Sequence, residues 1–502
     1  MGGGLIQIVA YGAQDVYLTG NPQITFFKVV YRRHTNFACE AIEQTFNGTP
    51  ALGNRTTVPI TRNGDLVTKM WLKTTIATTD TLTDVNSGTS SSDVSQYVLG
   101  AAGAALADSG GDVTISVDGG ILTLTQANDI DYTFAVGDVV QITNSASFDD
   151  YYTVAAAVTA SATVTLNGGS KGAVAPAGGD QNADISVTPY ASAETFSWGT
   201  DVGYSLINSI ELQIGGTKID KHYGKWMHIW SQLTKSSNQD VSHAQIIGPT
   251  TAAGAAPSHE LFVPLQFFCC RNDGLALPLI ALQYHDVRLE FNFETGQNTI
   301  VNLNTSGLSG SKGGNVSISN TSLLVNYIYL DSEERKRFAQ ASHEYLIEQL
   351  QFTGVETVST SGSNKIRLNF NHPVKELIWA AEKYAANVSH FDFSDGSSSN
   401  PVSKAIIQLN GHDRFSEQSG KFFNYVQTHT HHSRTPSVGI NVYSFALNPE
   451  EHQPSGTCNF SRIDNATLNV TTASSGSQLY VYGVNYNVLR IMSGMGGLAY
   501  SN

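Results

Sequence analysis

The stretch that decides the fold is Leu447 to Asn469, with the sequence LNPEEHQPSGTCNFSRIDNATLN. It contains too many turn-forming residues for a helix and too many apolar residues for a linker. Pro449 and Pro454 each remove a backbone donor and fix φ, and the Ser-Gly pair that follows permits a tight turn. The alternating run from Ala466 to Val470 then predicts a strand. We therefore expect a strand, a proline-bearing corner and a second strand, which is how antiparallel sandwiches pass from one sheet to the other.

The composition is that of a large, weakly charged globular protein. The chain has 502 residues, of which 41% are hydrophobic, so it can form two or three domains that each have a core. Charged residues make up only 14%, well below the roughly 25% of ordinary soluble domains. The formal net charge of −14 argues against direct contact with nucleic acid, because binding a phosphate backbone requires clustered Lys and Arg.

The cysteines and the hydropathy pattern indicate a protein made in the cytosol. Cys39, Cys269, Cys270 and Cys458 are too few and too scattered for a disulfide framework, and we interpret them as reduced thiols in the core. No basic segment followed by an apolar one resembles a signal peptide, and no run of about 18 apolar residues is long enough to span a bilayer.

The chain repeats itself. Ile42-Glu43-Gln44 recurs as Ile347-Glu348-Gln349, and each triplet is followed by a Phe and a Gly. Residues 210–227 recur at 405–423, where the matched positions are Gln213 with Gln408, Gly216 with Gly411, and Gly224-Lys225-Trp226 with Gly420-Lys421-Phe422. Each half also closes on an aromatic strand, at 323–330 and at 479–491. This order predicts two copies of one β domain.

The first copy contains an insertion. Ile42 lies 174 positions before Gly216, whereas Ile347 lies only 64 positions before Gly411. The roughly 110 extra residues fall between Thr79 and Phe196, where Ala, Gly, Ser, Thr and Asp dominate. One interpretation is a low-complexity loop. We favour an ordered β mini-domain, because segments such as VTISV and ILTLTQ alternate with the period of a strand.

Two helical segments are expected. Asp331 to Ser342, DSEERKRFAQAS, has an N-cap residue, acidic residues in the first turn and basic residues after them. It is the natural linker between the copies. A second helix or turn is expected at His222 to Leu233, where Trp226, Ile229 and Trp230 fall on one side and are predicted to be core residues rather than ligand-binding ones.

One segment of the sequence is a candidate metal site. No phosphate-binding loop, HExxH, GxSxG or paired CxxC motif occurs. His429, His431 and His432 lie in THTHHS, and on a strand the first two would share a face at roughly 7 Å and could bind a metal. Three further ligands are conceivable if they fold nearby: Glu450, Glu451 and His452. We favour the alternative of a histidine-rich strand or loop at a subunit contact, whose titration could tune assembly between pH 5 and 7. We therefore assign no catalytic, cofactor-binding or metal-binding residue.

Sequons for N-glycosylation occur at nine positions, most of which we attribute to chance in a chain rich in Asn, Ser and Thr. Asn304, Asn315 and Asn320 border the glycine-rich loop SGLSGSKGGN. They are the candidates expected to be most exposed.

Several long stretches carry a family resemblance. They include GAQDVYLTGNPQITFFKVVYRRHTNFACE at 12–40, INSIELQIGGTKIDKHYGKW at 207–226, QPSGTCNFSRID at 453–464 and VNYNVLRIMSGMGGLAYSN at 484–502. In this order they resemble the major capsid proteins of nucleocytoplasmic large DNA viruses, the group of iridoviruses, phycodnaviruses and mimivirus-like viruses. The resemblance covers almost the whole chain apart from the insertion.

The resemblance implies an all-β fold, a tandem double jelly roll of two eight-stranded antiparallel β-sandwiches with a β-rich insertion in the first. The domains would be an N-terminal arm (1–23), a first jelly roll (24–330, with the insertion at 80–196), a linker helix (331–342) and a second jelly roll (343–502). It further implies a structural protein without enzymatic activity or cofactor. Homotrimers would form pseudo-hexagonal capsomers of an icosahedral shell.

The implied partners are neighbouring capsomers, minor capsid and penton proteins and, through the N-terminal arm, an inner viral membrane. The protein would be made and assembled in the host cytoplasm and reside in the virion. A competing interpretation is a carbohydrate-binding protein or a cupin-like metal enzyme on a jelly-roll scaffold, because fold alone does not determine function. Only THTHHS could supply the metal cluster that such an enzyme needs.

Overall fold

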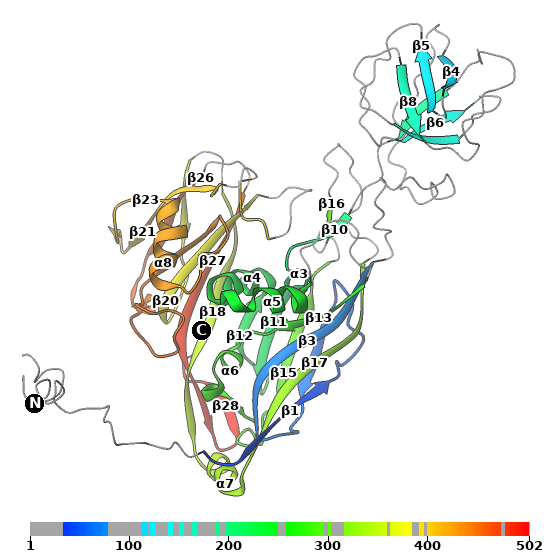
Figure 1. Ribbon diagram of the computed structural model, residues 1–502. Helices are drawn as coiled ribbons and strands as arrows, with labels where there is room; N and C mark the ends of the chain where they lie inside the picture. The colour runs from blue at the N-terminus through cyan, green and yellow to red at the C-terminus, as the bar shows by residue number, and fades with distance from the viewer. Residues whose placement is uncertain are drawn as a thin grey trace, which may run out of the picture.

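The computed structural model describes residues 34–78, 196–248, 258–295, 300–302, 316–358, 362–383, 391–395, 399–472 and 477–500, and the backbone of six strands between 113 and 190. Two β-sandwiches lie side by side, and the strands of the insertion lie apart from both (Figure 1). The expected arm at residues 1–23 lies outside the described residues.

The first sandwich has two antiparallel sheets of four main strands each. In sheet order, one contains β1 (Phe37–Gln44), β17 (Val316–Leu330), β3 (Leu66–Thr78) and β13 (Ser258–Pro264), and the other contains β12 (Thr217–Tyr223), β11 (Ile207–Ile214), β15 (Val287–Phe293) and β2 (Arg55–Ile60). The short β14 (Leu277–Pro278) pairs with β3, and β10 (Phe196–Trp198) pairs with β16 (Ile300–Asn302). Counted along the chain, the eight main strands have the order 1-8-3-6 and 5-4-7-2, which is a jelly roll.

The second sandwich has the same strand order. One sheet contains β18 (His343–Val358), β27 (Ser477–Met492), β20 (Pro373–Lys383) and β24 (Ile440–Ser444), and the other contains β19 (Ser363–Arg367), β26 (Ala466–Thr472), β21 (Val402–Leu409) and β22 (His412–Asp413). The accessory strands are β25 (Cys458–Asn459) on β20, β28 (Met495–Leu498) on β27 and β23 (Gln418–Ser419) on β21. The predicted tandem double jelly roll is confirmed.

The sequence repeat corresponds to a structural repeat. The two recurring triplets lie on β1 and β18, the first strand of each sandwich. The turn between the fourth and fifth strands is Gly215-Gly216 in one copy and Asn410-Gly411 in the other, and all four residues have φ between 51° and 81°. A two-residue hairpin with positive φ at both positions requires Gly or Asn, because other side chains clash there.

The corner predicted at 447–469 is also confirmed. β24 precedes it in one sheet and β26 follows it in the other, so the chain changes sheets there. The turn closes when the Leu447 N–H donates to the Ser455 carbonyl at 3.3 Å and the Asn448 N–H donates to the Ser455 hydroxyl at 2.9 Å. In β26, Leu468 and Val470 are fully buried in the core of the second sandwich.

Helices lie mainly between strands of the first sandwich. They are α3 (Val202–Ser205), α4 (Gly224–Thr234), α5 (Asp240–Ile247) and α6 (Phe268–Arg271), with single turns η2 (Ser237–Gln239) and η3 (Asp273–Leu275). The predicted helix at 222–233 is α4, and its Trp226, Ile229 and Trp230 are buried core residues, as expected. The described part of the chain has no helix long and apolar enough to cross a membrane.

One helix joins the two sandwiches, and the second sandwich has helical turns of its own. α7 (Ser332–Gln340) follows β17 directly, with Glu333 and Glu334 in its first turn, as predicted. The second sandwich has a π-helix, η5 (Phe422–Val426), which continues into α8 (Gln427–His431), and a single turn η6 (Phe460–Arg462).

The insertion contains a six-stranded antiparallel sheet in the order β4-β5-β8-β7-β6-β9. Its strands are β4 (Val113–Asp118), β5 (Ile121–Gln126), β6 (Val139–Thr143), β7 (Asp150–Val154), β8 (Thr163–Asn167) and β9 (Ser186–Tyr190). The sheet lies in the connection between the third and fourth strands of the first sandwich, which agrees with the predicted β-rich insertion.

The four cysteines are free thiols, as expected, but not all are core residues. Cys269 is buried, Cys270 and Cys458 are partly buried, and Cys39 is exposed. The prediction that Cys39 lies in the core is therefore wrong, because β1 is an edge strand with one uncovered face.

Candidate functional site

The two sandwiches are joined through a common apolar core. Trp226 of α4 packs on Tyr482 of β27 at 5.4 Å between ring centroids, and Tyr223 packs on Phe352 of β18 at 4.9 Å. Buried side chains of both sandwiches belong to this one cluster, whereas the second sandwich has a further core of its own. Burial of large aromatic side chains is a strong stabilising contribution, so the joint is held in one arrangement.

The edge of β18 is covered by the first sandwich. The Gln349 amide donates to the Ile219 carbonyl of β12, and the Leu350 N–H donates to Asp220 Oδ1 at 3.0 Å. The second oxygen of Asp220 lies 2.8 Å from His222 Nε2. An edge strand presents unpaired backbone groups, and here β12 satisfies one of them.

A buried ion cluster reinforces the same joint. Glu348 of β18 lies 3.0 Å from the Arg271 guanidinium of α6 and 2.8 Å from Lys375 Nζ of β20. The Arg271 guanidinium lies 4.2 Å from the Trp230 ring centroid, and Lys375 is fully buried. Because Lys375 is fully buried and Glu348 is only 8% exposed, removing the Glu348 carboxylate would leave the two cations in the joint without their counter-charge.

A second ion pair joins α4 to the second sandwich. Lys225 pairs with Glu382 of β20 and donates to the Tyr480 hydroxyl at 2.7 Å. Burial lowers the pKa of Lys225, although the Glu382 carboxylate opposes that shift.

The histidine segment lies on a helix rather than on the expected strand. His429 and His431 belong to α8, where residues two apart point to different sides. The helical backbone hydrogen bonds reach the end of the segment, since the His432 N–H donates to the Thr428 carbonyl at 2.9 Å. The Thr428 and Thr430 hydroxyls also donate to carbonyls four residues earlier, at 2.6 and 2.8 Å. The prediction of one strand face shared by His429 and His431 is therefore wrong.

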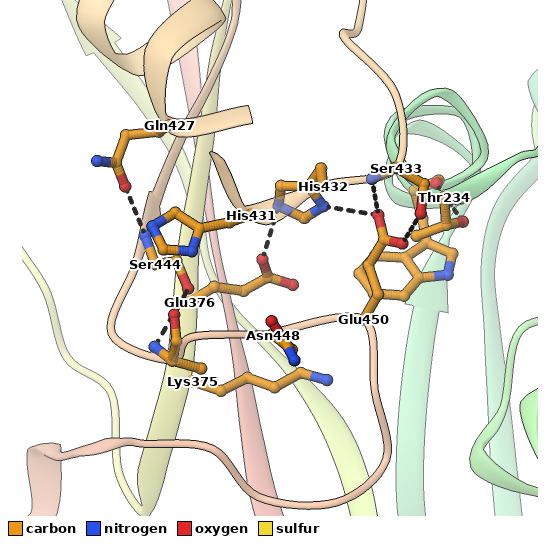
Figure 2. Close-up of polar contacts among 12 residues, drawn as sticks. Thr234, Lys375, Glu376, Gln427, His431, His432, Ser433, Ser444, Asn448 and Glu450 are labelled. Atoms are coloured by element: carbon orange, nitrogen blue, oxygen red, sulfur yellow. Dashed lines mark hydrogen bonds and ion pairs between the residues drawn. The ribbon is translucent and has the colours of Figure 1, made fainter. Parts of the chain in front are cut away.

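His432 is the buried member of the segment. Its Nε2 lies 3.1 Å from Glu376 Oε2 and its Nδ1 lies 3.0 Å from Glu450 Oε1 (Figure 2). The side chains of His432 and Glu376 are both 0% exposed. The Ser433 N–H donates to Glu450 Oε1 at 2.9 Å, and the Ser433 hydroxyl donates to the other oxygen. His432 thus attaches the corner that bears Glu450 to β20.

Burial by itself would lower the pKa of His432, but the two carboxylates outweigh burial and raise the pKa to about 9. Its imidazole is therefore a cation at neutral pH, and it does not titrate between pH 5 and 7. The pKa of Glu450 is lowered, because hydrogen bonds from His432 and Ser433 outweigh the opposing effect of burial.

This arrangement does not suit a metal. Both ring nitrogens of His432 face carboxylates, and His431 Nδ1 lies 2.9 Å from the Leu447 carbonyl. Of Glu450, Glu451 and His452, only Glu450 contacts a histidine of this segment within the described residues. The described part of the chain contains no group of three His, Cys, Asp or Glu side chains that could hold a metal ion.

Sequence reasoning missed Glu376 and Lys375. They lie in β20, whose sequence PVKELIWAAEK reads as a mostly apolar strand. Two adjacent charged residues inside such a strand indicate buried ion pairs, because charged residues are almost never fully buried unless they are paired.

The expected glycosylation sites are only partly described. Asn320 is exposed and has a φ of 50°, at an irregularity in the pairing of β17 with β3. Asn304 and Asn315 lie outside the described residues. Modification of the three therefore remains a prediction.

Comparisons with known proteins agree with this architecture. Residues 334–497 match the family described as large eukaryotic DNA virus major capsid protein, and residues 25–101 and 180–331 match the major capsid protein N-terminus. The major capsid protein of Pyramimonas orientalis virus is 41% identical over 531 residues, and that of Paramecium bursaria Chlorella virus 1 is 36% identical over 556 residues. Each alignment covers 100% of both chains.

Among solved structures, the PBCV-1 VP54 crystal structure has a TM-score of 0.62 and 30% sequence identity, and the match covers 95% of this chain and 100% of that one. These relatives are structural proteins of the virion rather than enzymes. The chain therefore belongs to the major capsid proteins of large eukaryotic DNA viruses.

Proposed function

We propose that three copies of this chain form a pseudo-hexagonal capsomer and that such capsomers tile an icosahedral shell. The observation that carries the proposal is the joint between the sandwiches. Each chain provides two blocks with the same strand order, and a common core and buried ion pairs hold them together. Three chains then provide six similar blocks.

Several finer features belong to this proposal. The chain would divide into an arm (1–23), a first jelly roll (24–330, with the insertion at 80–196), a linker helix (331–342) and a second jelly roll (343–502). The insertion would extend outward from the shell. The arm would contact minor capsid proteins or an inner membrane, and penton proteins would occupy the vertices. Synthesis and assembly would occur in the host cytoplasm, and Asn304, Asn315 and Asn320 are the proposed glycosylation sites.

The test is the solution mass of the purified protein by light scattering, with electron microscopy of the same fraction. Three chains of 53.8 kDa have a mass of about 161 kDa. A particle of that mass with a hexagonal outline is the expected result. A species that remains monomeric or dimeric up to micromolar concentrations would contradict the proposal.

A further inference from the structure

The repeated Ile-Glu-Gln triplet is buried by the first sandwich in its second copy, on β18, but not in its first copy, on β1. On β18, Ile347, Glu348 and Gln349 are all buried, and Arg271 of the first sandwich contacts Glu348. On β1, Ile42 is half-buried and the Glu43 side chain is 51% exposed. Both strands are edges of equivalent sheets. The chain therefore contains two versions of one edge, and its own first sandwich covers only the second version.

The exposed face of β1 alternates with the face that packs on the core. Ile42 packs on the core cluster and Gln44 is buried, so Phe37, Cys39 and Glu43 point the other way. Phe37 is 59% exposed, and Cys39 is exposed as well. Among the described residues nothing pairs with the outer edge of β1, which therefore presents unpaired backbone groups beside the exposed Phe37.

The same outer face has a definite charge. Lys73 of β3 lies 2.8 Å from Glu43 and 3.8 Å from Glu260 of β13. Two carboxylates around one ammonium leave a local net negative charge around Lys73. The partner of this face is therefore expected to supply a cation.

The elements that cover β18 have counterparts in the second sandwich. β12 and α6 cover β18. β22 is the fifth strand of its sandwich, as β12 is of the first. The segment 445–457, which we call the 445–457 corner, corresponds to the connection of the first sandwich that contains α6. The connection with α6 leads to β14, which pairs with the third strand β3. The 445–457 corner leads to β25, which pairs with the third strand β20.

The counterpart surface is exposed and carries a cation. Ile219 follows Gly216 by three residues, and Arg414 follows the matched Gly411 by three. Ile219 is the residue whose carbonyl meets β18. His412 and Arg414 are exposed, and Leu447 of the corner is 72% exposed. This surface has the same position relative to its own sandwich as the surface that covers β18.

The outer face of β1 and the surface that contains β22 lie on opposite sides of the chain. In Figure 1, β1, β17 and β13 lie on the side of the first sandwich away from the second, and β21, the strand with which β22 pairs, lies on the side of the second sandwich away from the first. Surfaces that differ and lie on opposite sides join copies head to tail. Such contacts give a ring when the rotation closes and a filament when it does not.

We propose that the outer face of β1 in one copy is covered by β22 and the 445–457 corner of a second copy, with Arg414 facing Glu43. This contact between two chains has the same arrangement as the joint between the two sandwiches of one chain. It rests on the proposed capsomer, whose subunit contact it specifies. Leu447 supplies apolar area beside the Phe37 side of β1.

The first test is a charge exchange measured by light scattering over a dilution series. Glu43→Lys and Arg414→Glu each place like charges opposite one another, and each is expected to raise the concentration at which the trimer dissociates by at least about tenfold. The double variant Glu43→Lys with Arg414→Glu restores the attraction, and its dissociation concentration is expected to return to within about threefold of the wild type.

The controls are Glu356→Lys and Arg367→Glu, which change exposed residues of the same types on β18 and β19. Both are expected to dissociate like the wild type. If the wild type is trimeric and the Glu43 and Arg414 variants dissociate at the same concentration as the wild type, this contact is wrong. The proposed capsomer would not be contradicted by that result. A double variant no tighter than the single variants would also overturn this contact. A monomeric wild type would overturn the proposed capsomer and this contact together.

A second measurement uses the wild-type protein and needs no variant. Cys39 points to the same side as Glu43, so its reaction with a maleimide is expected to be at least about tenfold slower in the trimer than in dilute monomer. Peptide mapping separates Cys39 from the other three cysteines. Equal rates for Cys39 in trimer and monomer would contradict the contact.

Discussion

At the scale of single residues, the corner depends on one buried histidine. His432 lies between Glu376 and Glu450, and all three charges are largely removed from water. Two carboxylates around one imidazolium leave one net negative charge, which hydrogen bonds from Ser433 to Glu450 help to stabilise. The cluster is therefore structural, and its energy depends on the protonation state of His432.

We predict an alkaline loss of stability that His432 controls. The pKa of His432 is about 9 in the folded protein and about 6.5 when unfolded. A folded pKa above the unfolded value stabilises the protein fully below pH 6.5, and this stabilisation is lost as the pH rises through 9. The loss should be on the order of 2 to 3 kcal/mol. Urea unfolding of the wild type and His432→Gln at pH 6 and pH 9.5 measures it.

The His432→Gln variant should be less stable than the wild type at pH 6 by roughly 3 kcal/mol, because Glu376 is then buried without its partner. Its further loss between pH 6 and pH 9.5 should be smaller than that of the wild type. His429→Gln, at an exposed position, is the matched control and should follow the wild type. Equal losses in the wild type and His432→Gln would contradict this role.

The sequence could not have shown how the members of this cluster pair. The histidines and Glu450 stood out because they lie in unusual local stretches, whereas Glu376 is 56 positions before His432. Which carboxylate meets which imidazole depends on how the third strand and the corner come together. That pairing is a property of the folded chain rather than of local spacing.

At the scale of elements, the helices after the fifth strands begin in the same way in both sandwiches. Gly224 is the first residue of α4, and Gly420 lies two residues before η5. A Cβ on Gly224 would overlap the carbonyl oxygen of Ile207, and one on Gly420 would overlap that of Val402. Ile207 and Val402 are the first residues of the two fourth strands, so each glycine lets a helix start pass close to a strand.

We predict that Gly224→Ala and Gly420→Ala each destabilise the protein by about 1 to 3 kcal/mol, because the backbone atoms they would strike cannot move aside easily. Gly497→Ala is the matched control, since a Cβ there meets nothing within 4 Å, and it should change the free energy of unfolding by less than about 0.5 kcal/mol. Urea unfolding measures all three. An unchanged midpoint for Gly224→Ala and Gly420→Ala would contradict the close approach.

The sequence predicted the division into two similar β domains, their closing strands at 323–330 and 479–491, and the helices at 222–233 and 331–342, because the internal repeat, the strand period and the helix caps leave clear patterns. It failed at THTHHS. A helix there was implied by the repeat itself, since Gly420-Lys421-Phe422 matches Gly224-Lys225-Trp226 and the latter begins α4. The local composition of the segment points the other way, because Thr, which is β-branched, and His both have a weak preference for helices.

At the scale of the whole molecule, the insertion is an addition to one connection. The third strand of the first sandwich ends at Thr78 and β10 begins at Phe196. The second sandwich makes the same connection between Lys383 and Val402, and the described residues of this connection form no such sheet. Both sandwiches nevertheless have the same strand order, so the jelly roll does not require the insertion.

We predict that replacing residues 80–195 by a Gly-Ser linker, as long as the connection between Lys383 and Val402, preserves folding and association. The melting temperature should change by less than about 5 °C, because surface loops tolerate large changes in length. Calorimetry and light scattering measure both properties. An aggregated or monomeric product beside a trimeric wild type would show that the insertion supports the core or the contact between copies.

The joint between the sandwiches also bears on how assembly depends on protein concentration. β18 meets β12 within one polypeptide, so this joint forms in a unimolecular step at a high effective concentration. Contacts between copies obey mass action and weaken on dilution. In a ring of six sandwiches made from three chains, dilution would therefore act on only half of the joints, and the dissociation product would be a preassembled pair rather than a single sandwich.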